Sequence, residues 1–324
     1  SNMGNAQQGK GDPDSAIFSY KKAIKITPEL EATRSQMLCQ QSYICDWGAI
    51  EEYRGLIPFL GTLTQNISPF TMLAFEDKPV SSLKRAKLYS IKNDKQKLSY
   101  KKVSLGQRKE KLKIAYCSGF FTQNPVSILT AKIIELHDRS HFEVFGFYYG
   151  KSPSDQYLKR IQAGVDTFVD VCQLSDKNIA EVIHGYEIDI AIDLHGYMEG
   201  ARSGVLAFRP APIQINYFGY PGTLGADFID YIVGDEVVIP ESQKQNYSEN
   251  IIFLPNCYMP QDNTRLVSNK LTSRLDCGLP NSGFIFCCFN SSHKITPQEF
   301  DIWMRLLDKV KGSALWLLKS NKWA

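Results

Sequence analysis

Several features are missing from this 324-residue sequence, and each absence excludes a class of protein. No run of about 18 apolar residues occurs, so the sequence predicts no membrane-spanning helix. The formal net charge is only +3, which gives no general basis for binding nucleic acid or a membrane surface. The N-terminal stretch "SNMGNAQQGKGDPD" lacks the apolar core of a signal peptide. The sequence therefore predicts a cytoplasmic protein with neither a nucleic-acid nor a membrane partner.

Cysteine and histidine patterns typical of metal sites are also missing. The eight cysteines form no C-x-x-C pair, and the five histidines supply no zinc-binding spacing beside them. We therefore expect a reducing compartment and no structural metal. Cys117, Cys287 and Cys288 lie in apolar, strand-like segments, where a free cysteine acts as a small buried hydrophobic residue.

Residues 1–30 match part of the pattern of a tetratricopeptide repeat, a helical hairpin of about 34 residues, so we predict a partial repeat there. The matching positions are Gly4, Ala16, Tyr20, Ala23 and Pro28. Small residues at Gly4 and Ala16 allow close helix packing, and Pro28 ends the second helix. One repeat cannot bury its own apolar face, so we expect further repeats before it. The alternative is a lone hairpin that packs on the next segment.

Residues 31–110 are predicted to form a helical region and a basic linker. Apolar residues recur at three- to four-residue spacing in "ATRSQMLCQQSYICDWGAIEEYRGLI", as in amphipathic helices. Residues 92–113 then hold nine Lys or Arg against two acids. We interpret this stretch as a solvated linker, with a phosphate-attracting patch as the alternative.

The pattern changes at residue 111, where apolar strand-like segments begin to alternate with helical ones. Strands are expected at 112–118, 142–149, 188–194 and 251–255, with helices at 125–138, 152–161 and 175–186. This alternation indicates a parallel sheet covered on both faces, so we predict an α/β domain over 111–258. Residues 259–324 are predicted to start a second α/β domain. Its elements are a strand at 283–290, a helix from Thr296 and a strand at 313–318.

Ligands of parallel α/β sheets bind beyond the carboxyl ends of the strands, so the loops there are the candidate sites. The first loop, 118–127, carries Asn124 and Ser127 beside a predicted helix start. A helix N-terminus attracts phosphate, which makes these side chains candidates for donor binding. The alternative is that Thr122 or Asn124 caps the helix.

The second loop places polar groups directly after an apolar strand. Asp193, His195 and Tyr197 follow "IDIAI", and an acid beside an imidazole suits a general base or a substrate hydroxyl. For Arg202 we expect an ion pair with Asp193, with a phosphate contact as the alternative.

The third loop belongs to the stretch "FRPAPIQINYFGYPGTLGADFIDYIVGD", residues 208–235, which is rich in proline, glycine and aromatic residues. Its turn is Tyr220-Pro221-Gly222-Thr223. We expect this turn to present backbone N–H groups and the Thr223 hydroxyl on one concave surface. Such a surface suits sugar hydroxyls or phosphate oxygens.

The second α/β part offers the loop "CCFNSSHKITP", residues 287–297. Thr296, Pro297 and Glu299 have the spacing of a capping box at a helix start. Lys294 precedes the positive end of that helix, an arrangement that favours a diphosphate. The alternative is an exposed loop lysine without a ligand.

These motifs together resemble the nucleocytoplasmic O-linked N-acetylglucosamine transferase family, which includes the SPINDLY proteins. The stretches that carry the resemblance are "DLHGYMEGARSGVLAFRPAPIQINYFGYPGTLGADFIDYIVGD", "YSENIIFLP" and "FCCFNSSHKITP". The resemblance implies tetratricopeptide helical hairpins, then a GT-B glycosyltransferase Rossmann-like domain and the start of a second one. It also implies that the sequence is truncated at both ends.

The resemblance implies an inverting transfer of N-acetylglucosamine from UDP-N-acetylglucosamine to Ser or Thr of proteins bound through the repeats, without a metal or other cofactor. Lys294 matches the family's lysine on the donor phosphates, with Asn290 and Ser291 in its loop. Gly222 and Thr223 match the turn of the first half. A GDP-fucose donor and a non-catalytic repeat-bearing scaffold are the alternatives.

This sequence departs from the family pattern at three positions. Phe120 and Asn124 stand where the family usually has Asp and His, so no base can act at Asn124. Ser291 replaces the usual Gln or Asn. The later nucleotide-binding elements are missing as well, so we expect this polypeptide to bind UDP-sugar weakly and to be inactive by itself.

Overall fold

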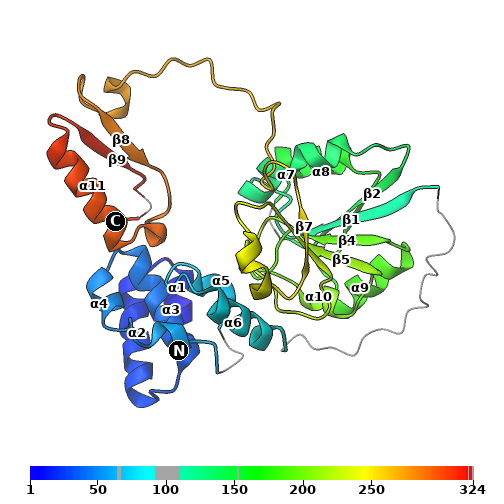
Figure 1. Cartoon of the computed structure of the whole chain (residues 1–324), viewed down its shortest axis with the longest axis horizontal. Helices are drawn as coiled ribbons and strands as arrows, with labels where there is room; N and C mark the ends of the chain where they lie inside the picture. The colour runs from blue at the N-terminus through cyan, green and yellow to red at the C-terminus, as the bar shows by residue number, and fades with distance from the viewer. Residues whose placement is uncertain (64–66, 92–109, 152, 320, 323–324) are drawn as a thin grey trace. The chain divides into compact units, whose positions relative to one another are not determined.

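The computed structural model describes residues 1–63, 67–91, 110–151, 153–319 and 321–322. The chain divides into two compact units. Figure 1 colours the chain along its sequence, from blue at the N-terminus to red at the C-terminus. One unit, called here the sheet unit, contains residues 68–70 and 78–265; the other, the helical unit, contains 1–67, 71–77 and 266–324. Most of the predicted basic linker, residues 92–109, lies outside the described residues.

A seven-stranded parallel sheet forms the centre of the sheet unit. Its strands are β1 (Leu112–Ser118), β2 (Phe142–Tyr148), β3 (Thr167–Asp170), β4 (Ile190–Asp193), β5 (Ile213–Asn216), β6 (Tyr231–Gly234) and β7 (Asn250–Phe253). The spatial order is β3-β2-β1-β4-β5-β6-β7, so the chain winds outward in both directions from β1 and β4. The parallel sheet predicted from the sequence is confirmed.

Helices cover both faces of this sheet. They are α6 (Pro79–Ile91), α7 (Pro125–Leu136), α8 (Gln156–Gly164), α9 (Asp176–Gly185), α10 (Gly204–Ala207) and the 3-10 helix η2 (Glu241–Asn246). Alternate residues of β1 enter different cores: Ala115 and Cys117 pack in the cluster that includes α9, whereas Ile114 and Tyr116 pack in the one that includes α7. This alternation follows from the two-residue period of a strand and accounts for the continuous apolar run.

Three strands, β3, β5 and β6, were not predicted from the sequence. β5 and β6 are only four residues long and lie inside the stretch 208–235, among its prolines and glycines. β3 is equally short, lies at the sheet edge and buries no residue fully. Short strands of this kind leave too few periodic positions to be recognised from sequence.

In the helical unit, α1 (Asn2–Gly9) and α2 (Pro13–Ile26) form the predicted hairpin. A Cβ at Gly4 would overlap the ring of Tyr20, and both Ala16 and Tyr20 are completely buried. The close packing expected from these small residues is therefore confirmed. The assignment of the hairpin to a tetratricopeptide repeat stays a prediction.

Further helices follow the hairpin: α3 (Glu31–Tyr43), α4 (Trp47–Glu51), the 3-10 helix η1 (Ile57–Phe59) and α5 (Pro69–Met72), of which residues 69–70 belong to the sheet unit. The helical unit also contains β8 (Ile285–Cys288), α11 (Pro297–Lys309) and β9 (Ala314–Leu317), as predicted, with β8 and β9 parallel. Two 3-10 turns, η3 (Leu275–Cys277) and η4 (Ser292–Lys294), flank β8.

The predicted burial of the strand cysteines is only partly correct. Cys117 is buried, but Cys288 is half-buried and Cys287 is exposed. Cys287 lies in a sheet of two strands, and none of the four residues of β8 is fully buried. The apolar sequence run therefore overestimated the burial of this strand.

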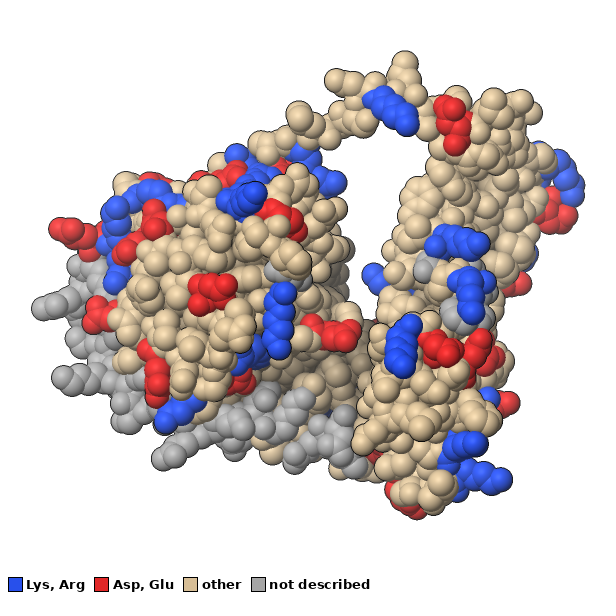
Figure 2. All heavy atoms as spheres, turned by 180° about the vertical axis from the view of Figure 1, so that it is seen from behind, with Lys and Arg blue, Asp and Glu red and all other residues tan. Residues whose placement is uncertain are grey.

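The surface carries mixed charge: on the face in Figure 2, basic and acidic side chains are interspersed over each unit. Within the described ranges, no helix combines the length and the apolar character needed to cross a bilayer.

Candidate active site

A cleft of about 600 Å³ opens at the carboxyl edge of the seven-stranded sheet. It is lined by residues that follow four strands: Gly119, Phe120, Tyr149, Gly150, Lys151, Cys172, Leu174, His195, Gly200 and Arg202. Of the predicted site residues, His195 lies in this lining. The cleft is therefore located where ligands of parallel α/β sheets bind.

Asp193 ends β4 and is only 3% exposed. Its Oδ1 accepts a hydrogen bond from the backbone N of His195 at 2.9 Å, and its Oδ2 accepts one from the backbone N of Gly196 at 3.2 Å. Burial raises the pKa of this carboxyl, and the two N–H donors oppose that shift. Both oxygens are thus used to fix the turn that begins the loop.

His195 is 1% exposed, and backbone groups engage both of its ring nitrogens. Nδ1 accepts a hydrogen bond from the backbone N of Gly119 at 3.3 Å, so Nε2 carries the proton and donates to the carbonyl of Glu199 at 2.9 Å. Burial lowers the pKa of His195, which keeps the ring neutral. The imidazole therefore joins the loop after β1 to the loop after β4.

Aromatic rings enclose this imidazole. Phe120 stacks on it with ring centroids 3.9 Å apart, and the ring of Tyr149 lies 5.7 Å away at a similar inclination. Phe120 is the residue that replaces the acid expected from the family pattern. In this protein the position contributes an apolar cover to His195 rather than a charge.

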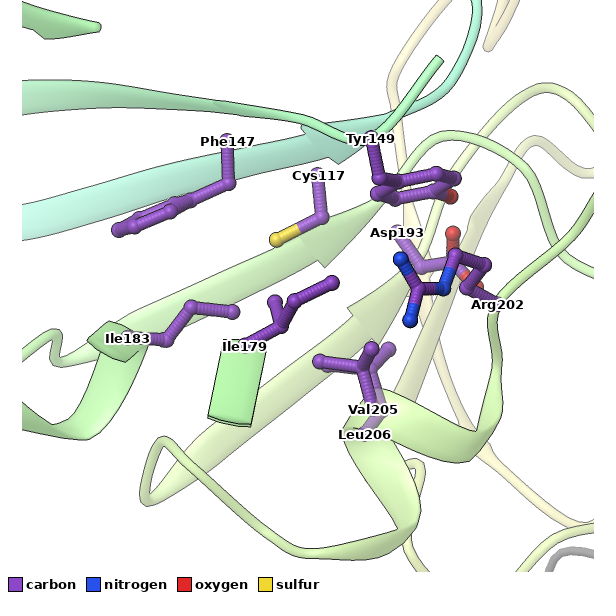
Figure 3. A pocket seen from close by; sticks show the side chains of 9 residues that line it. All are labelled: Cys117, Phe147, Tyr149, Ile179, Ile183, Asp193, Arg202, Val205 and Leu206. Carbon is purple, nitrogen blue, oxygen red and sulfur yellow. The ribbon is translucent and has the colours of Figure 1, made fainter. Parts of the chain in front are cut away.

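A small pocket shares Tyr149 and Arg202 with the cleft (Figure 3). Figure 3 shows Tyr149, Asp193 and Arg202 at one end, Phe147 and Ile183 at the other, and Cys117 between them. Arg202 makes its ion pair with Asp176, at 2.6 Å, and donates to the carbonyl of Leu174. The predicted pair between Arg202 and Asp193 is therefore wrong. Asp193 is already satisfied by backbone N–H groups, and Asp176 at the start of α9 lies within reach.

Asn124 caps a helix. Its Oδ1 accepts a hydrogen bond from the backbone N of Val126 at 3.0 Å, at the N-terminus of α7. Ser127 is fully buried and donates to the carbonyl of Phe120. The capping alternative is thus what the structure shows, and the two side chains hold the loop after β1 in place.

The turn 220–223 has a different orientation from the one predicted. Thr223 is 4% exposed and donates to Oε2 of Glu249 at 2.6 Å, while Oε1 of Glu249 accepts the backbone N–H of Leu224 at 2.6 Å. The expectation that the Thr223 hydroxyl faces a ligand is therefore wrong. The carboxylate of Glu249, just before β7, accepts hydrogen bonds from both of these donors.

Tyr197 also points inward, since its hydroxyl donates to the carbonyl of Leu224 at 2.6 Å. Tyr220 is buried and Pro221 is exposed, and both line a second pocket of about 270 Å³. Its other lining residues are Phe218, Ile232, Val233, Val238, Ile239 and Tyr258. Most of these lining side chains are apolar, and Gly222, the residue after Pro221, is partly buried.

Asn216 is a residue that the sequence analysis missed. It ends β5 next to Asp193 of β4, is fully buried, and donates through Nδ2 to the carbonyl of Gly222 at 3.1 Å. Its Oδ1 is buried without a hydrogen-bond partner among the described residues. The signal was a polar residue closing the strand segment "IQIN", much as Asp193 closes "IAID".

The remaining predicted residues lie in the helical unit, in the loop after β8. Asn290 and Lys294 are exposed, and Ser291 is partly buried at the start of η4. The capping box of Thr296 and Glu299 is present, which confirms that prediction. Lys294 is therefore an exposed cation two residues before the N-cap of α11.

Comparisons with known proteins match this chain to one family. The model of glycosyl transferase family 41 matches residues 86–270 and 266–322. The probable UDP-N-acetylglucosamine–peptide N-acetylglucosaminyltransferase SEC of Arabidopsis thaliana is 40% identical over 215 residues, which cover 65% of this chain and 22% of that protein. The Petunia hybrida relative named SPINDLY is 30% identical over 211 residues, or 63% of this chain and 22% of that protein.

A solved structure shows the same fold. A mutant of the Thermobaculum terrenum O-GlcNAc transferase superposes with a TM-score of 0.68 at 23% identity, over 98% of this chain and 54% of that one. The chain thus spans about half of the solved structure and 22% of the two curated relatives. The family model covers most of the sequence, and the resemblance seen in the motifs is confirmed: the chain belongs to glycosyl transferase family 41.

Proposed function

We propose that this protein is a protein O-glycosyltransferase that moves N-acetylglucosamine from UDP-N-acetylglucosamine to Ser and Thr hydroxyls. The observation that carries the proposal is the family 41 match, which runs through both α/β parts of the chain. The printed names of the relatives, UDP-N-acetylglucosamine–peptide N-acetylglucosaminyltransferases, support this donor and a protein acceptor.

We also assign the parts of the fold to parts of that enzyme. The sheet unit is the first Rossmann-like half of a GT-B glycosyltransferase, and β8, α11 and β9 belong to the second half. The hairpin of α1 and α2 is a tetratricopeptide unit that helps to bind protein acceptors. The protein acts in the cytoplasm, without a metal.

Lys294 is the residue that we assign to the donor diphosphate. In an inverting transfer the acceptor oxygen attacks the anomeric carbon while the bond to the diphosphate breaks, so negative charge develops on the departing UDP. An exposed ammonium group close to the N-terminus of the 13-residue helix α11 supplies positive charge where that anion would lie. Asn290 and Ser291 lie in the same loop, between β8 and η4, and we assign them to the same donor site.

Asp193 and His195 we assign as positioning residues of the acceptor-side cleft. Both carboxylate oxygens of the buried Asp193 already accept backbone N–H groups, and the backbone N–H of Gly119 donates to Nδ1, the one acceptor nitrogen of the His195 ring. These contacts therefore shape the cleft wall, and we assign the proton of the acceptor hydroxyl to solvent water rather than to either side chain.

The test is sugar transfer by the protein at its natural length. Purified protein is incubated with an acceptor protein mixture and either radiolabelled UDP-N-acetylglucosamine or radiolabelled GDP-fucose. We expect label to enter Ser and Thr only from the UDP-sugar. Label from GDP-fucose alone would move the assignment to a fucosyltransferase, and no transfer from either donor would contradict the enzyme assignment.

A further inference from the structure

The loop that carries Lys294 is attached to the helices that precede the sheet unit in sequence. Oγ of Ser292 donates to the carbonyl of Tyr43 at 2.7 Å, and Nε1 of Trp47 donates to the carbonyl of Ile295 at 3.1 Å. The amide of Asn321, beyond β9, donates to the same Tyr43 carbonyl at 2.8 Å. All these residues belong to the helical unit.

Ring contacts accompany the hydrogen bonds on both sides of the lysine. The rings of Tyr43 and His293 have centroids 4.6 Å apart, and those of Trp47 and Phe300 are 5.2 Å apart. Burial and the nearby charge of Lys294 lower the pKa of His293, so a neutral ring packs against Tyr43. The residues just before and just after Lys294 are thus held, while Lys294 itself is exposed.

The helical segment has a defined geometry at this point. Helix α3 ends at Tyr43, and Cys45 takes a left-handed conformation with φ of 57°. Asp46 then caps α4 by accepting a hydrogen bond from the backbone N of Ala49 at 3.3 Å. The connection between α3 and α4 is therefore short and fixed at both ends. Tyr43 and Trp47, which lie on either side of it, contact the same loop.

We propose that Tyr43 and Trp47 are positioning residues for Lys294. They hold residues 291–296 at the carboxyl edge of β8 and β9, so that the ammonium group is presented to the donor diphosphate. Donor affinity then depends on a helical segment that does not itself touch the donor. This inference rests on the proposed function, because it needs Lys294 to bind the diphosphate.

The experiment compares two tryptophan substitutions by titration calorimetry with UDP, using the protein at its natural length. Trp47→Phe removes the indole N–H and keeps an aromatic ring, whereas Trp303→Phe makes the same change on α11, where the ring contacts Phe300. We expect Trp47→Phe to weaken UDP binding roughly threefold to tenfold, the effect of one lost hydrogen bond. Trp303→Phe should bind UDP as the unsubstituted protein does.

A double-mutant cycle with Lys294→Ala separates positioning from general structural damage. If Trp47 acts through Lys294, Trp47→Phe has no further effect on UDP affinity once Lys294 is removed. An equal loss in both backgrounds, or no loss in Trp47→Phe, overturns the inference. Ser292→Ala, which removes the bond to the Tyr43 carbonyl, gives a second estimate if Trp47→Phe fails to fold.

The cycle also shows which hypothesis has failed. If Lys294→Ala leaves UDP affinity unchanged, the assignment of Lys294 to the donor diphosphate is wrong, and so is the inference that rests on it. If Lys294→Ala weakens binding while Trp47→Phe and Ser292→Ala do not, only the positioning role of the helical segment is wrong.

Discussion

The rings of Phe120 and His195 are stacked, with centroids 3.9 Å apart and planes inclined by 27°. Phe120 covers an imidazole whose nitrogens both pair with backbone groups, one from Gly119 and one from Glu199. Such a ring has no nitrogen available to take a proton. The ring lies between two loops of the cleft, and their backbone groups supply its hydrogen bonds. The buried imidazole therefore needs no carboxylate as a hydrogen-bond partner.

The first prediction concerns this histidine in catalysis. His195→Gln should lower the transfer rate by roughly tenfold, because the two loops lose one shared contact, and the shape of the pH–rate profile should not change. The measurement is kcat/KM from pH 5 to pH 9 for both proteins. A loss of about 100-fold or more, together with disappearance of an acidic limb below pH 6.5, would instead identify His195 as a general base.

The second prediction is a pH dependence of stability. Burial lowers the pKa of His195, so the unfolded chain binds its proton more readily than the folded chain does. The contribution to stability is therefore present above the unfolded pKa, about 6.5, and is lost as the pH falls below it. We expect Tm to fall from pH 7.5 to pH 5.5, and to fall less in His195→Gln. Equal falls in both proteins would contradict this account.

The third prediction concerns the buried carboxylate of Glu249. Thr223→Val removes the hydroxyl that donates to Oε2 of Glu249 at 2.6 Å, so this buried carboxylate oxygen loses one hydrogen bond. We expect the free energy of unfolding in denaturant to decrease by about 1.5 to 3 kcal/mol. Thr167→Val in β3 makes the same chemical change at a half-buried edge-strand position and should cost less than about 0.5 kcal/mol. A harmless Thr223→Val would mean that this hydroxyl is free to face a ligand after all.

The fourth prediction concerns Gly225, which has φ of +60° and packs against α6. A Cβ at this position would overlap the backbone N of Lys87, so Gly225→Ala must push α6 away. Gly200 has φ of +79°, but its nearest neighbour in the direction of a Cβ is Nε2 of His195 at 4.0 Å.

Gly200→Ala should therefore cost only about 1 to 2 kcal/mol of unfolding free energy, the strain of the left-handed conformation. Gly225→Ala should cost at least about twice as much, since steric overlap with backbone is added to the same strain. Chemical denaturation of both variants checks the difference. Similar losses would show that α6 does not pack tightly on this turn.

Local signals in the sequence predicted much of the fold. The seven-residue apolar run of β1 and the Thr296–Glu299 capping box were correctly located, because their determinants lie within a few neighbouring residues. β5 and β6 were missed, since four-residue strands between prolines and glycines show no usable periodicity.

The site was less predictable because its contacts are distant in sequence. Thr223 was expected to face a ligand, and its actual partner, Glu249, lies 26 residues away. The roles of Asp193 and His195 likewise depend on backbone N–H groups, which no side-chain pattern reveals. By contrast, Lys294 was correctly expected to precede a helix N-terminus, a relationship that is local.

The most direct test of the central proposal is the affinity of the protein, at its natural length, for UDP with and without the Lys294 ammonium group. Titration calorimetry should show Lys294→Ala binding UDP at least about tenfold more weakly, because a charge-assisted contact with the diphosphate is lost. Lys309→Ala, which removes the same charge at the opposite end of α11, should bind as the unsubstituted protein does. Equal affinity of all three proteins, or no binding of UDP by any of them, would contradict the assignment of Lys294 to a nucleotide-sugar donor.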